Sequence, residues 1–359
     1  MQVTVVAPGE LGAAHLAAWR AMQDADPELA SPFLAPEFVR AVGHQRPAAR
    51  VAVLSDGQRP VGFFPFERHW LGLGLPIGSG LCDRQGLIHA PDLAWDPAAL
   101  LRACRLQLWR YDHLTAGQAP FETLGVHHMV SPVIELGHGF DSYFASLRSK
   151  SLRGTKRLLD KERRLSRRIG EVRLAFDDSA PEALEALMRC KSAQYRSKGQ
   201  LDLFSRPWAV ALLRELLRSR AANCTGTLSV LYAGERPVAW HFGLRSRRVL
   251  QYWFPAYDPD VAPFSPGILL LLKMAEAAAS LGIHHIDLGK GAEPYKQQLK
   301  TGDHRVAEGW VRRPTVAATM RRAQAEAATK ARVAVADNPA LRRAALFTLN
   351  AFPSLRKSW

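Results

Sequence analysis

The sequence predicts an α/β (α+β) fold of two lobes with mixed, largely antiparallel sheets, followed by a basic helical tail. Three observations support this prediction. A chain of 359 residues is longer than one ordinary hydrophobic core organises, which predicts two domains. Residues 225–257 contain three strand-like runs separated by short turns, as in an antiparallel meander. The stretch Val249–Lys296 then reads as strand, loop, helix, strand and helix, a βαβ arrangement that ends in a second helix.

The composition excludes several classes of protein. Hydrophobic residues make up 47% of the chain and charged residues 23%, which is typical of a globular protein. No apolar run is long enough to span a membrane, and the first residues lack the basic and apolar regions of a signal peptide. The four cysteines are far apart and form no C-x-x-C pair, which disfavours zinc and disulfides. We therefore expect a cytoplasmic protein with reduced thiols and no metal.

The net charge of +15 is concentrated in two segments. Arg148–Arg168 holds ten basic and two acidic residues, and Arg312–Trp359 again holds ten basic and two acidic residues. The first segment reads as a basic helix, which either is solvated along a thin apolar stripe or forms a collar for an anionic cofactor or glycan carrier. Nucleic acid is disfavoured as a partner because no aromatic residues are interleaved with the charges.

The first lobe is expected to span residues 1–139. Alternating apolar residues predict strands over 2–7, 50–54, 60–68 and 129–136, and apolar helical patterns predict helices over 11–22, 36–42 and 97–109. Asp56-Gly57 favours a tight hairpin turn between two of the strands. The glycine-rich stretch Gly72–Gly80 is expected to be a close-packed loop or bulged strand. It is no dinucleotide fingerprint, because Ile77 occupies the third glycine position.

The second lobe is expected to span residues 140–311. Helices are predicted over 140–147, 149–168, 181–198 and 206–220. Strands are predicted over 171–176, 225–232, 237–245, 249–257, 283–288 and 304–311. The tail, residues 312–359, alternates alanine with arginine and reads as one or two helices interrupted at Asn338-Pro339.

The helix after residue 265 is expected to start in a way that favours anions. Ser265 suits the N-cap with its hydroxyl, Pro266 suits the first helical position, and Gly267 allows a ligand to approach the backbone. The first amides of a helix lack internal partners and carry the positive end of the dipole, so they bind phosphate readily. The alternative is an ordinary βαβ unit buried in a core.

Three short motifs in this region carry a family resemblance: Tyr257-Asp258, Phe264–Gly267 and Asp287–Lys296. They resemble the GNAT superfamily of acyl-CoA N-acyltransferases, and within it the bacterial CelD/BcsL-like branch of acetyltransferases of cellulose and exopolysaccharide biosynthesis. That branch is related in fold to the Fem-type aminoacyltransferases. The motifs cover Phe140–Val311, and the usual Q/R-x-x-G-x-G/A signature is replaced by Ser-Pro-Gly. The resemblance implies tandem GNAT-like lobes, the first degenerate and the second catalytic.

The resemblance also implies a reaction, the transfer of an acetyl or other acyl group from acyl-CoA to an amine. The acceptor would be an amino sugar of an exopolysaccharide or its precursor, free or lipid-linked. Strand 249–257 would splay from strand 283–288, so that its backbone pairs with the pantetheine arm of the cosubstrate acetyl-CoA. The residues expected to bind this cosubstrate are Tyr252, Phe254, Ser265, Pro266, Gly267, Ile268, Gly289, Lys290 and Lys296, with the pyrophosphate on the amides of Ser265, Gly267 and Ile268.

Catalysis would need a proton donor for the leaving thiolate and a base for the amine. Tyr295 occupies the position where such enzymes often place the tyrosine that protonates the thiolate. Glu293 and His241 are the preferred bases, ahead of Asp287 and Asp258. Each has a structural alternative: a core aromatic for Tyr295, a buried strand histidine for His241 and a hydrogen-bonded acid at a strand end for Asp287.

Two other functions remain open. A Fem-like enzyme would use aminoacyl-tRNA, although no long heptad run predicts the coiled-coil arm of those proteins. A non-catalytic module would sense an anionic ligand through the tail. Paired arginines such as Arg321-Arg322 bind phosphates well, so a cyclic dinucleotide or the inner, anionic membrane surface are candidate ligands of the tail.

Overall fold

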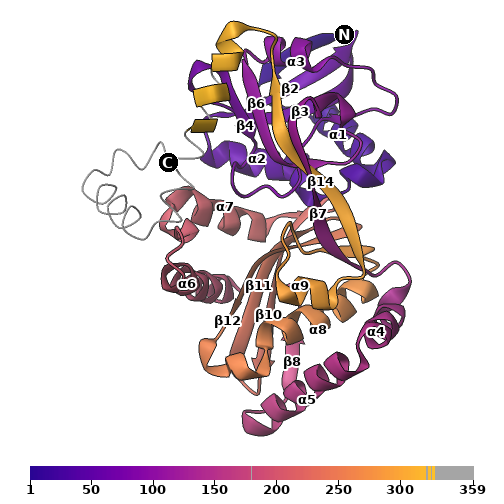
Figure 1. Ribbon diagram of the computed structural model, residues 1–359, viewed down its shortest axis with the longest axis vertical. Coiled ribbons are helices and arrows are strands. Elements are labelled where there is room, and N and C mark those ends of the chain that lie inside the picture. Colours follow the sequence, from indigo (N-terminus) through magenta and orange to yellow (C-terminus); the bar gives the residue numbers. More distant parts are fainter. Residues whose placement is uncertain (179, 321, 325, 328–359) are drawn as a thin grey trace, which may run out of the picture.

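The computed structural model describes residues 1–178, 180–320, 322–324 and 326–327. Two lobes follow one another along the long axis of the molecule, and their strands join in one sheet (Figure 1). The tail hypothesis falls largely outside the described residues, apart from a helical stretch at 316–320.

The first lobe is built from residues 1–135. Its strands are β1 (Gln2–Val6), β2 (Ala49–Asp56), β3 (Arg59–Arg68), β4 (Leu73–Pro76), β5 (Ile88–His89), β6 (Leu108–Thr115) and β7 (Leu124–Glu135). Its α-helices are α1 (Ala13–Ala25), α2 (Pro36–Gln45) and α3 (Pro97–Ala103). Short 3-10 helices connect them at Pro8–Glu10, Pro27–Leu29, Pro32–Leu34, Trp70–Gly72 and Ala119–Phe121.

The second lobe follows from residue 139. Its helices are α4 (Gly139–Lys150), α5 (Leu152–Arg168), α6 (Pro181–Ser197), α7 (Pro207–Arg218), α8 (Pro266–Ser280) and α9 (Pro294–Leu299). Its strands are β8 (Val172–Ala175), β9 (Arg220–Ala221), β10 (Cys224–Ala233), β11 (Arg236–Arg245), β12 (Val249–Tyr257), β13 (His285–Asp287) and β14 (Gly302–Arg312). The 3-10 helices are Leu203–Ser205 and η7 (Pro259–Phe264).

The two lobes repeat one strand pattern. In the first, β1, β2, β3 and β4 pair antiparallel in sequence, and β4 then pairs parallel with β6. In the second, β8, β10, β11 and β12 pair antiparallel, and β12 then pairs parallel with β13. Each parallel pair needs a crossover connection, which is α8 in the second lobe. The structure therefore confirms two lobes with mixed, largely antiparallel sheets.

The last strand of each lobe joins the sheet of the other. β7 pairs with β13 of the second lobe, and β14 pairs with β6 of the first. β7 and β14 also pair with each other, which makes the sheet continuous. Because strands from both parts of the sequence alternate here, the domain limits 139/140 and 311/312 stay a prediction.

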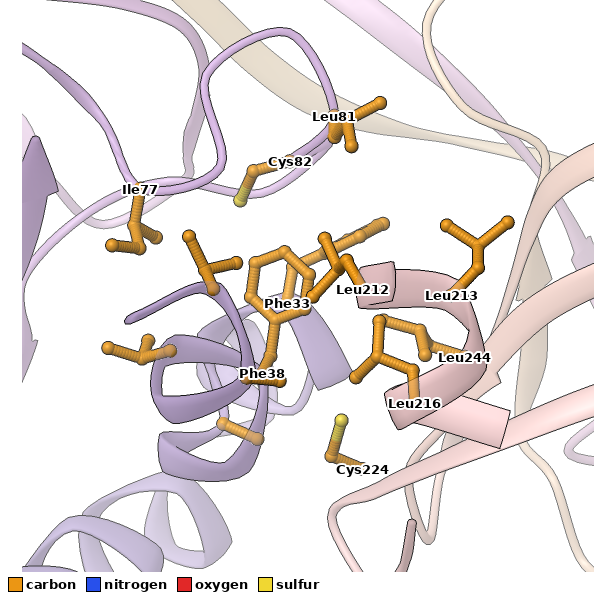
Figure 2. Packing of buried hydrophobic residues seen from close by; sticks show 14 of the residues in the cluster. Phe33, Phe38, Ile77, Leu81, Cys82, Leu212, Leu213, Leu216, Cys224 and Leu244 are labelled. Atoms are coloured by element: carbon orange, nitrogen blue, oxygen red, sulfur yellow. The ribbon is translucent and has the colours of Figure 1, made fainter. Parts of the chain in front are cut away.

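A hydrophobic cluster packs the two lobes against each other. Phe33 and Phe38 from the first lobe are fully buried against Leu212, Leu213 and Leu216 of α7. Figure 2 shows these side chains facing one another, with Ile77, Leu81 and Cys82 of the loop after β4 above them. This contact fixes the loop after β4 close to the second lobe.

Three predicted elements differ from the observed ones. The helix predicted over 97–109 ends at Ala103, because Arg105 adopts a φ of 55° and residues 108–115 form β6. β7 begins at Leu124 rather than at residue 129. The basic helix begins at Leu152, because Ser151 is extended and its hydroxyl caps α5 by accepting from the Gly154 amide.

Candidate functional site

Strands β12 and β13 run side by side only where they begin. Their parallel pairing ends with Gln251 opposite Asp287. Beyond that pair the chain leaves β12, and the Leu288 amide donates to the Pro132 carbonyl of β7. Within the described part of the chain, no strand therefore lies beside the β12 edge from Tyr252 to Tyr257. We call this opening, bounded by Gln251, Asp287 and that edge, the strand fork; it confirms the predicted splay.

A β-bulge lies at the strand fork. The register between β11 and β12 shifts between Phe242 and Leu244, so Gly243 faces an extra residue of β12. A Cβ atom on Gly243 would lie 2.0 Å from the Gln251 carbonyl oxygen, closer than van der Waals contact allows. Only glycine fits at position 243, so this single residue is required for the bulge.

The bulge separates two of the predicted cofactor residues. Tyr252 packs in the cluster beneath α8, whereas Phe254 packs in the cluster beneath α6 and α7. Both side chains are almost fully buried. They lie on opposite faces of the sheet, so their side chains do not form one wall of the strand fork.

His241 supports the bulge from within the protein. Its imidazole is fully buried, stacks on the Tyr252 ring with centroids 4.6 Å apart, and its Nε2 accepts from the Trp253 amide at 3.2 Å. Burial lowers the pKa of His241 to about 3, although the Gln251 carbonyl opposes this shift. A neutral ring that already accepts a hydrogen bond is a weak candidate for the general base, and that role of His241 stays a prediction.

The start of α8 differs in detail from the prediction. Ser265 adopts a left-handed conformation and makes no side-chain cap; its hydroxyl accepts from Lys161 Nζ at 2.6 Å instead. The Ser265 amide donates to the Ala262 carbonyl, and the Ile268 amide donates to the Ser265 carbonyl. Among the three amides predicted to hold pyrophosphate, Gly267 alone has no partner within the described part of the chain.

Pro266 begins α8 as predicted, and Gly267 follows in an open position. A Cβ atom on Gly267 would meet the Tyr257 ring at 3.6 Å, an ordinary contact. The backbone amide of Gly267 is therefore approachable, but its glycine is not forced by crowding. Ile268 is half-buried against the cluster beneath α8, so it contributes packing at this helix start.

A basic groove lies beside the start of α8. Lys161 of α5 contacts Ser265, and the Arg164 guanidinium lies 6.0 Å from the centre of the Phe264 ring. The groove is a shallow, open hollow of about 660 Å³ along one face of α5. Its lining residues are Leu152, Arg153, Lys156, Arg157, Asp160, Lys161 and Arg164. The collar of positive charge predicted for the basic helix is therefore next to the predicted anion-binding amides.

Asp287 closes the base of the strand fork. Its carboxylate accepts from Arg84 Nη2 and Ser131 Oγ, each at 2.5 Å, and from the Gly289 amide at 2.9 Å. Burial would raise the pKa of Asp287, but Arg84, Ser131 and the Gly289 amide lower it to about 2. With its oxygens occupied, this carboxylate is a structural acid that ties the lobes together.

The lysines after β13 are held by backbone and by partners. Lys296 is buried, donates to the carbonyls of Gly289 and Lys290 at 3.1 Å each, and pairs with Glu293 at 3.0 Å. Lys290 donates to the Asp112 carbonyl at 3.0 Å, which joins it to the first lobe. Lys296 is thus no solvated lysine, and Glu293 is a half-exposed carboxylate beside a cation.

Tyr295 remains compatible with a proton donor. It packs against the cluster beneath α8, with its ring 6.4 Å from the Tyr252 ring. Burial raises the pKa of Tyr295, and the Glu293 carboxylate adds to the shift. No hydrogen bond of its hydroxyl is found among the described residues, so this group is free to meet a substrate.

Side chains of α6 reach the free edge of β12, which the sequence did not predict. Lys191 Nζ donates to the Pro255 carbonyl at 2.8 Å, and Cys190 and Gln194 contact the Tyr257 carbonyl. Burial lowers the pKa of Lys191 to about 8, with Lys198 adding to the shift. No spacing in the sequence links α6 with β12, because the contact depends on how the helix packs on the sheet.

The loop after β4 brings a second unpredicted group to the site. Arg84 contacts Asp287, as described above, and the neighbouring Asp83 lies against Gly289: a Cβ atom there would be 3.5 Å from Asp83 Oδ2. These residues lie some two hundred positions before β13 in the chain. The only hint in the sequence is a run of charged residues after a glycine-rich stretch.

Comparisons with known proteins agree with this geometry. Residues 153–297, from α5 to α9, match a family described as "Acetyltransferase (GNAT) domain". A comparison with curated proteins finds no match. Among solved structures the chain is similar to FemX, with 11% identity, a TM-score of 0.55, and coverage of 86% of this chain and 96% of that one.

A second solved structure is the C-terminal domain (DUF2156) of a protein assigned as a lysylphosphatidylglycerol synthetase from Agrobacterium fabrum. It shares 10% identity and a TM-score of 0.52 with this chain, covering 80% of this chain and 91% of that one. At such identities the likeness concerns the fold alone. Residues 153–297 thus match a GNAT domain, the first lobe repeats the strand order of the second, and the CelD/BcsL-like branch stays a prediction.

Proposed function

We propose that this protein is an N-acyltransferase that moves an acetyl or longer acyl group from acyl-CoA to an amine. The observation that carries the proposal is the strand fork with its bulge, next to a helix start flanked by basic side chains. An extended thioester arm fits an unpaired strand edge, because backbone groups there lack strand partners. Phosphate groups fit the helix start and the groove beside it.

The charges near α8 support binding of the CoA phosphates. The free Gly267 amide and the Lys161 ammonium lie at the helix start, where the macrodipole adds positive potential. Arg164 and the other basic residues of the groove extend this potential along α5. Lys290 and Lys296 are engaged with the protein, so we assign them to shaping the turn after β13 rather than to phosphate.

The chemistry would divide between two sides of the strand fork. The acyl carbon would lie near the bulge, where the amine attacks and the carbon–sulfur bond breaks. Tyr295 would donate its hydroxyl proton to the leaving thiolate; the raised pKa keeps this hydroxyl protonated until the thiolate forms. Lys296 and Glu293 would fix the helix that carries Tyr295.

The acceptor follows from the sequence motifs. Their resemblance to acetyltransferases of polysaccharide biosynthesis favours an amino sugar of an exopolysaccharide or of a lipid-linked precursor. We also propose a cytoplasmic protein, at the inner membrane face when the acceptor is lipid-linked. Among the described residues, no helix combines the length and apolar character needed to cross a bilayer.

One observation favours a second candidate, a Fem-like transferase that uses aminoacyl-tRNA. Two of the three amides expected to bind pyrophosphate are occupied, and α6 occupies the carbonyls of Pro255 and Tyr257 on the fork edge. Fewer backbone groups are then left for CoA, whereas the exposed basic face of α5 also suits a nucleic acid backbone. The third candidate, a sensor of a cyclic dinucleotide, depends on tail residues outside the described ones.

Calorimetric titration and thermal shift would separate these candidates. Acetyl-CoA, CoA, deacylated tRNA and a cyclic dinucleotide are titrated separately into the full chain. We expect acetyl-CoA to stabilise the protein, because a ligand at 100 times its dissociation constant adds about 2.7 kcal/mol. Lys161→Ala and Arg164→Ala should weaken binding of acetyl-CoA at least fivefold. Arg167→Ala, an exposed residue of α5 that lies about one turn beyond Arg164 and does not line the groove, is the control.

The titrations with the different ligands distinguish the three candidate functions. Stabilisation by tRNA without an effect of acetyl-CoA would replace the proposed donor by aminoacyl-tRNA. Binding of the cyclic dinucleotide alone would favour the sensor. Equal loss of affinity in the Arg167 variant would show that general charge, rather than the groove at α8, attracts the ligand.

A further inference from the structure

Asp83 of the first lobe reaches the strand fork of the second. Its loop follows β4 and is held between the lobes, where Leu81 and Cys82 are buried in the shared hydrophobic cluster (Figure 2). The next residue, Arg84, contacts Asp287 at the base of the fork. Asp83 Oδ2 lies 3.5 Å from where a Cβ atom on Gly289 would be, just past β13.

Unlike those of Asp112 and Asp287, the carboxylate oxygens of Asp83 accept no hydrogen bond from a residue that the structure describes. Its side chain retains 28% of its exposure, and its ion-pair partner is His113, whose Nε2 lies at 3.7 Å, too far for a hydrogen bond. The other side of that ring, Nδ1, contacts Asp112 Oδ1 at 3.0 Å. Asp112 is also bound by Gln85 Nε2 at 2.5 Å, so it orients His113.

The surroundings shift the pKa values of Asp83 and Asp112 in opposite directions. Burial raises the pKa of Asp83, with the carboxylates of Asp287 and Asp112 adding to the rise and His113 and Arg84 opposing it. Burial would also raise the pKa of Asp112, but His113, Gln85 and Lys290 lower it to about 2. Such a pair separates into one carboxylate held as an anion and one whose protonated form its surroundings favour.

We propose that Asp83 is the catalytic base of the transferase reaction, supplied to the second lobe by the first. This inference rests on the proposed function. The amine nitrogen attacks the acyl carbon, one N–H proton passes to a carboxylate oxygen of Asp83, and the carbon–sulfur bond breaks with the thiolate taking the Tyr295 proton. His113, oriented by Asp112, is a positioning residue for Asp83. The products are an amide and a thiol.

This assignment explains why the lobes share one site. The bases expected from the second lobe are unsuited, because His241 is buried and neutral and the oxygens of Asp287 are occupied. Glu293 is paired with Lys296, and Asp258 is paired with Arg236. Asp83 alone among these carboxylates combines a place at the fork, partial exposure and a free oxygen. The degenerate first lobe then has a catalytic duty in addition to packing.

The test compares Asp83→Asn with the wild type, using acetyl-CoA as donor and thiol release as readout. Asp141→Asn, an exposed carboxylate of α4, is the matched control. Glucosamine is partly protonated at neutral pH, so its attack depends strongly on a general base. Hydroxylamine is largely neutral at that pH and depends on a base less. We expect Asp83→Asn to lower kcat with glucosamine by about 100-fold and with hydroxylamine by about threefold or less. The rising limb of the pH profile should also disappear.

A second readout needs no turnover. Carbodiimide and glycinamide modify accessible carboxyls, and mass spectrometry of the labelled protein reports Asp83. We expect acetyl-CoA to protect Asp83 and not Asp141. Equal loss of kcat for both nucleophiles, an unchanged pH profile, or labelling of Asp83 unaffected by the donor would overturn the inference.

The same experiments separate this inference from the proposed function. If the wild type neither binds nor cleaves acetyl-CoA, the proposed donor fails, and the variants are compared with aminoacyl-tRNA, because amide formation requires loss of the same proton. If the wild type is active and Asp83→Asn equals it, the donor assignment stands and the role of Asp83 is refuted.

Discussion

Replacing Asp287 by asparagine should damage the fold more than the chemistry. The side chain is 1% exposed and its carboxylate is the partner of Arg84, itself 4% exposed and located on the other lobe. Asparagine keeps the shape but removes the charge, and Arg84 is left buried without an anion. Breaking a buried ion pair in this way costs about 3–5 kcal/mol.

The pKa shift of Asp287 gives a second measure of how much its interactions stabilise the fold. The carboxyl of Asp287 has an ordinary value of 3.8 and a folded value of about 2, a difference worth about 2 kcal/mol. Because the folded pKa is the lower one, this stabilisation is present above pH 3.8 and is lost as the pH falls through about 2. An asparagine side chain at this position cannot titrate, so the variant should lack this part of the acid dependence.

Urea unfolding at several pH values from 7 down to 3 measures both effects. The wild type should lose stability toward the acid end, and Asp287→Asn should be less stable at pH 7 with a flatter profile. Asp303→Asn is the matched control, because its carboxylate pairs with Lys300 at the surface. A variant with wild-type stability and no activity would refute the structural role and restore Asp287 as a base.

Three further substitutions test the framework of the site. His241→Phe should lower the free energy of unfolding in urea by about 1–3 kcal/mol, because the Trp253 amide loses its acceptor. The pH profile of activity between pH 5 and 8 should keep its shape, since the His241 pKa of about 3 lies outside that range. Loss of the rising part of that profile would return His241 to catalysis. Gly243→Ala should cost at least about 1–3 kcal/mol, because its Cβ would lie 2.0 Å from the Gln251 carbonyl oxygen; wild-type stability would contradict the bulge. Leu213→Ala, in the cluster between the lobes, should lower the free energy of unfolding by about 2–5 kcal/mol, with Leu281→Ala at an exposed position as control.

Local patterns predicted most elements of the second lobe because their causes are local. Pro266 cannot lie deep in a helix and marks the start of α8, and the alternating residues of β10 to β12 fit a meander. The helix predicted over 97–109 failed because its apolar residues continue into β6 without a proline or glycine to mark the change. A left-handed Arg105 ends the helical run, and nothing in its identity predicts that conformation.

The candidate site was predicted only in outline. The start of α8 and the basic helix were anticipated because each lies within a short stretch of sequence, whereas the fork was expected only from the resemblance to GNAT acyltransferases. The roles of single residues changed where a partner comes from far away: Ser265 meets Lys161, and Asp287 meets Arg84. A hydroxyl or carboxylate in sequence shows its chemistry but not which neighbour will occupy it.

By itself, the sequence determined the two-lobed α/β class through the periodicity of its apolar residues. It also determined the start of the α8 crossover through the proline ring of Pro266, and the bulge through Gly243, where a side chain would be crowded. Tertiary structure alone decided that β7 and β14 exchange between lobes and that Asp83 arrives at the strand fork. Such contacts join residues 150 or more positions apart, and they are selected by the packing of whole elements, which no local pattern encodes.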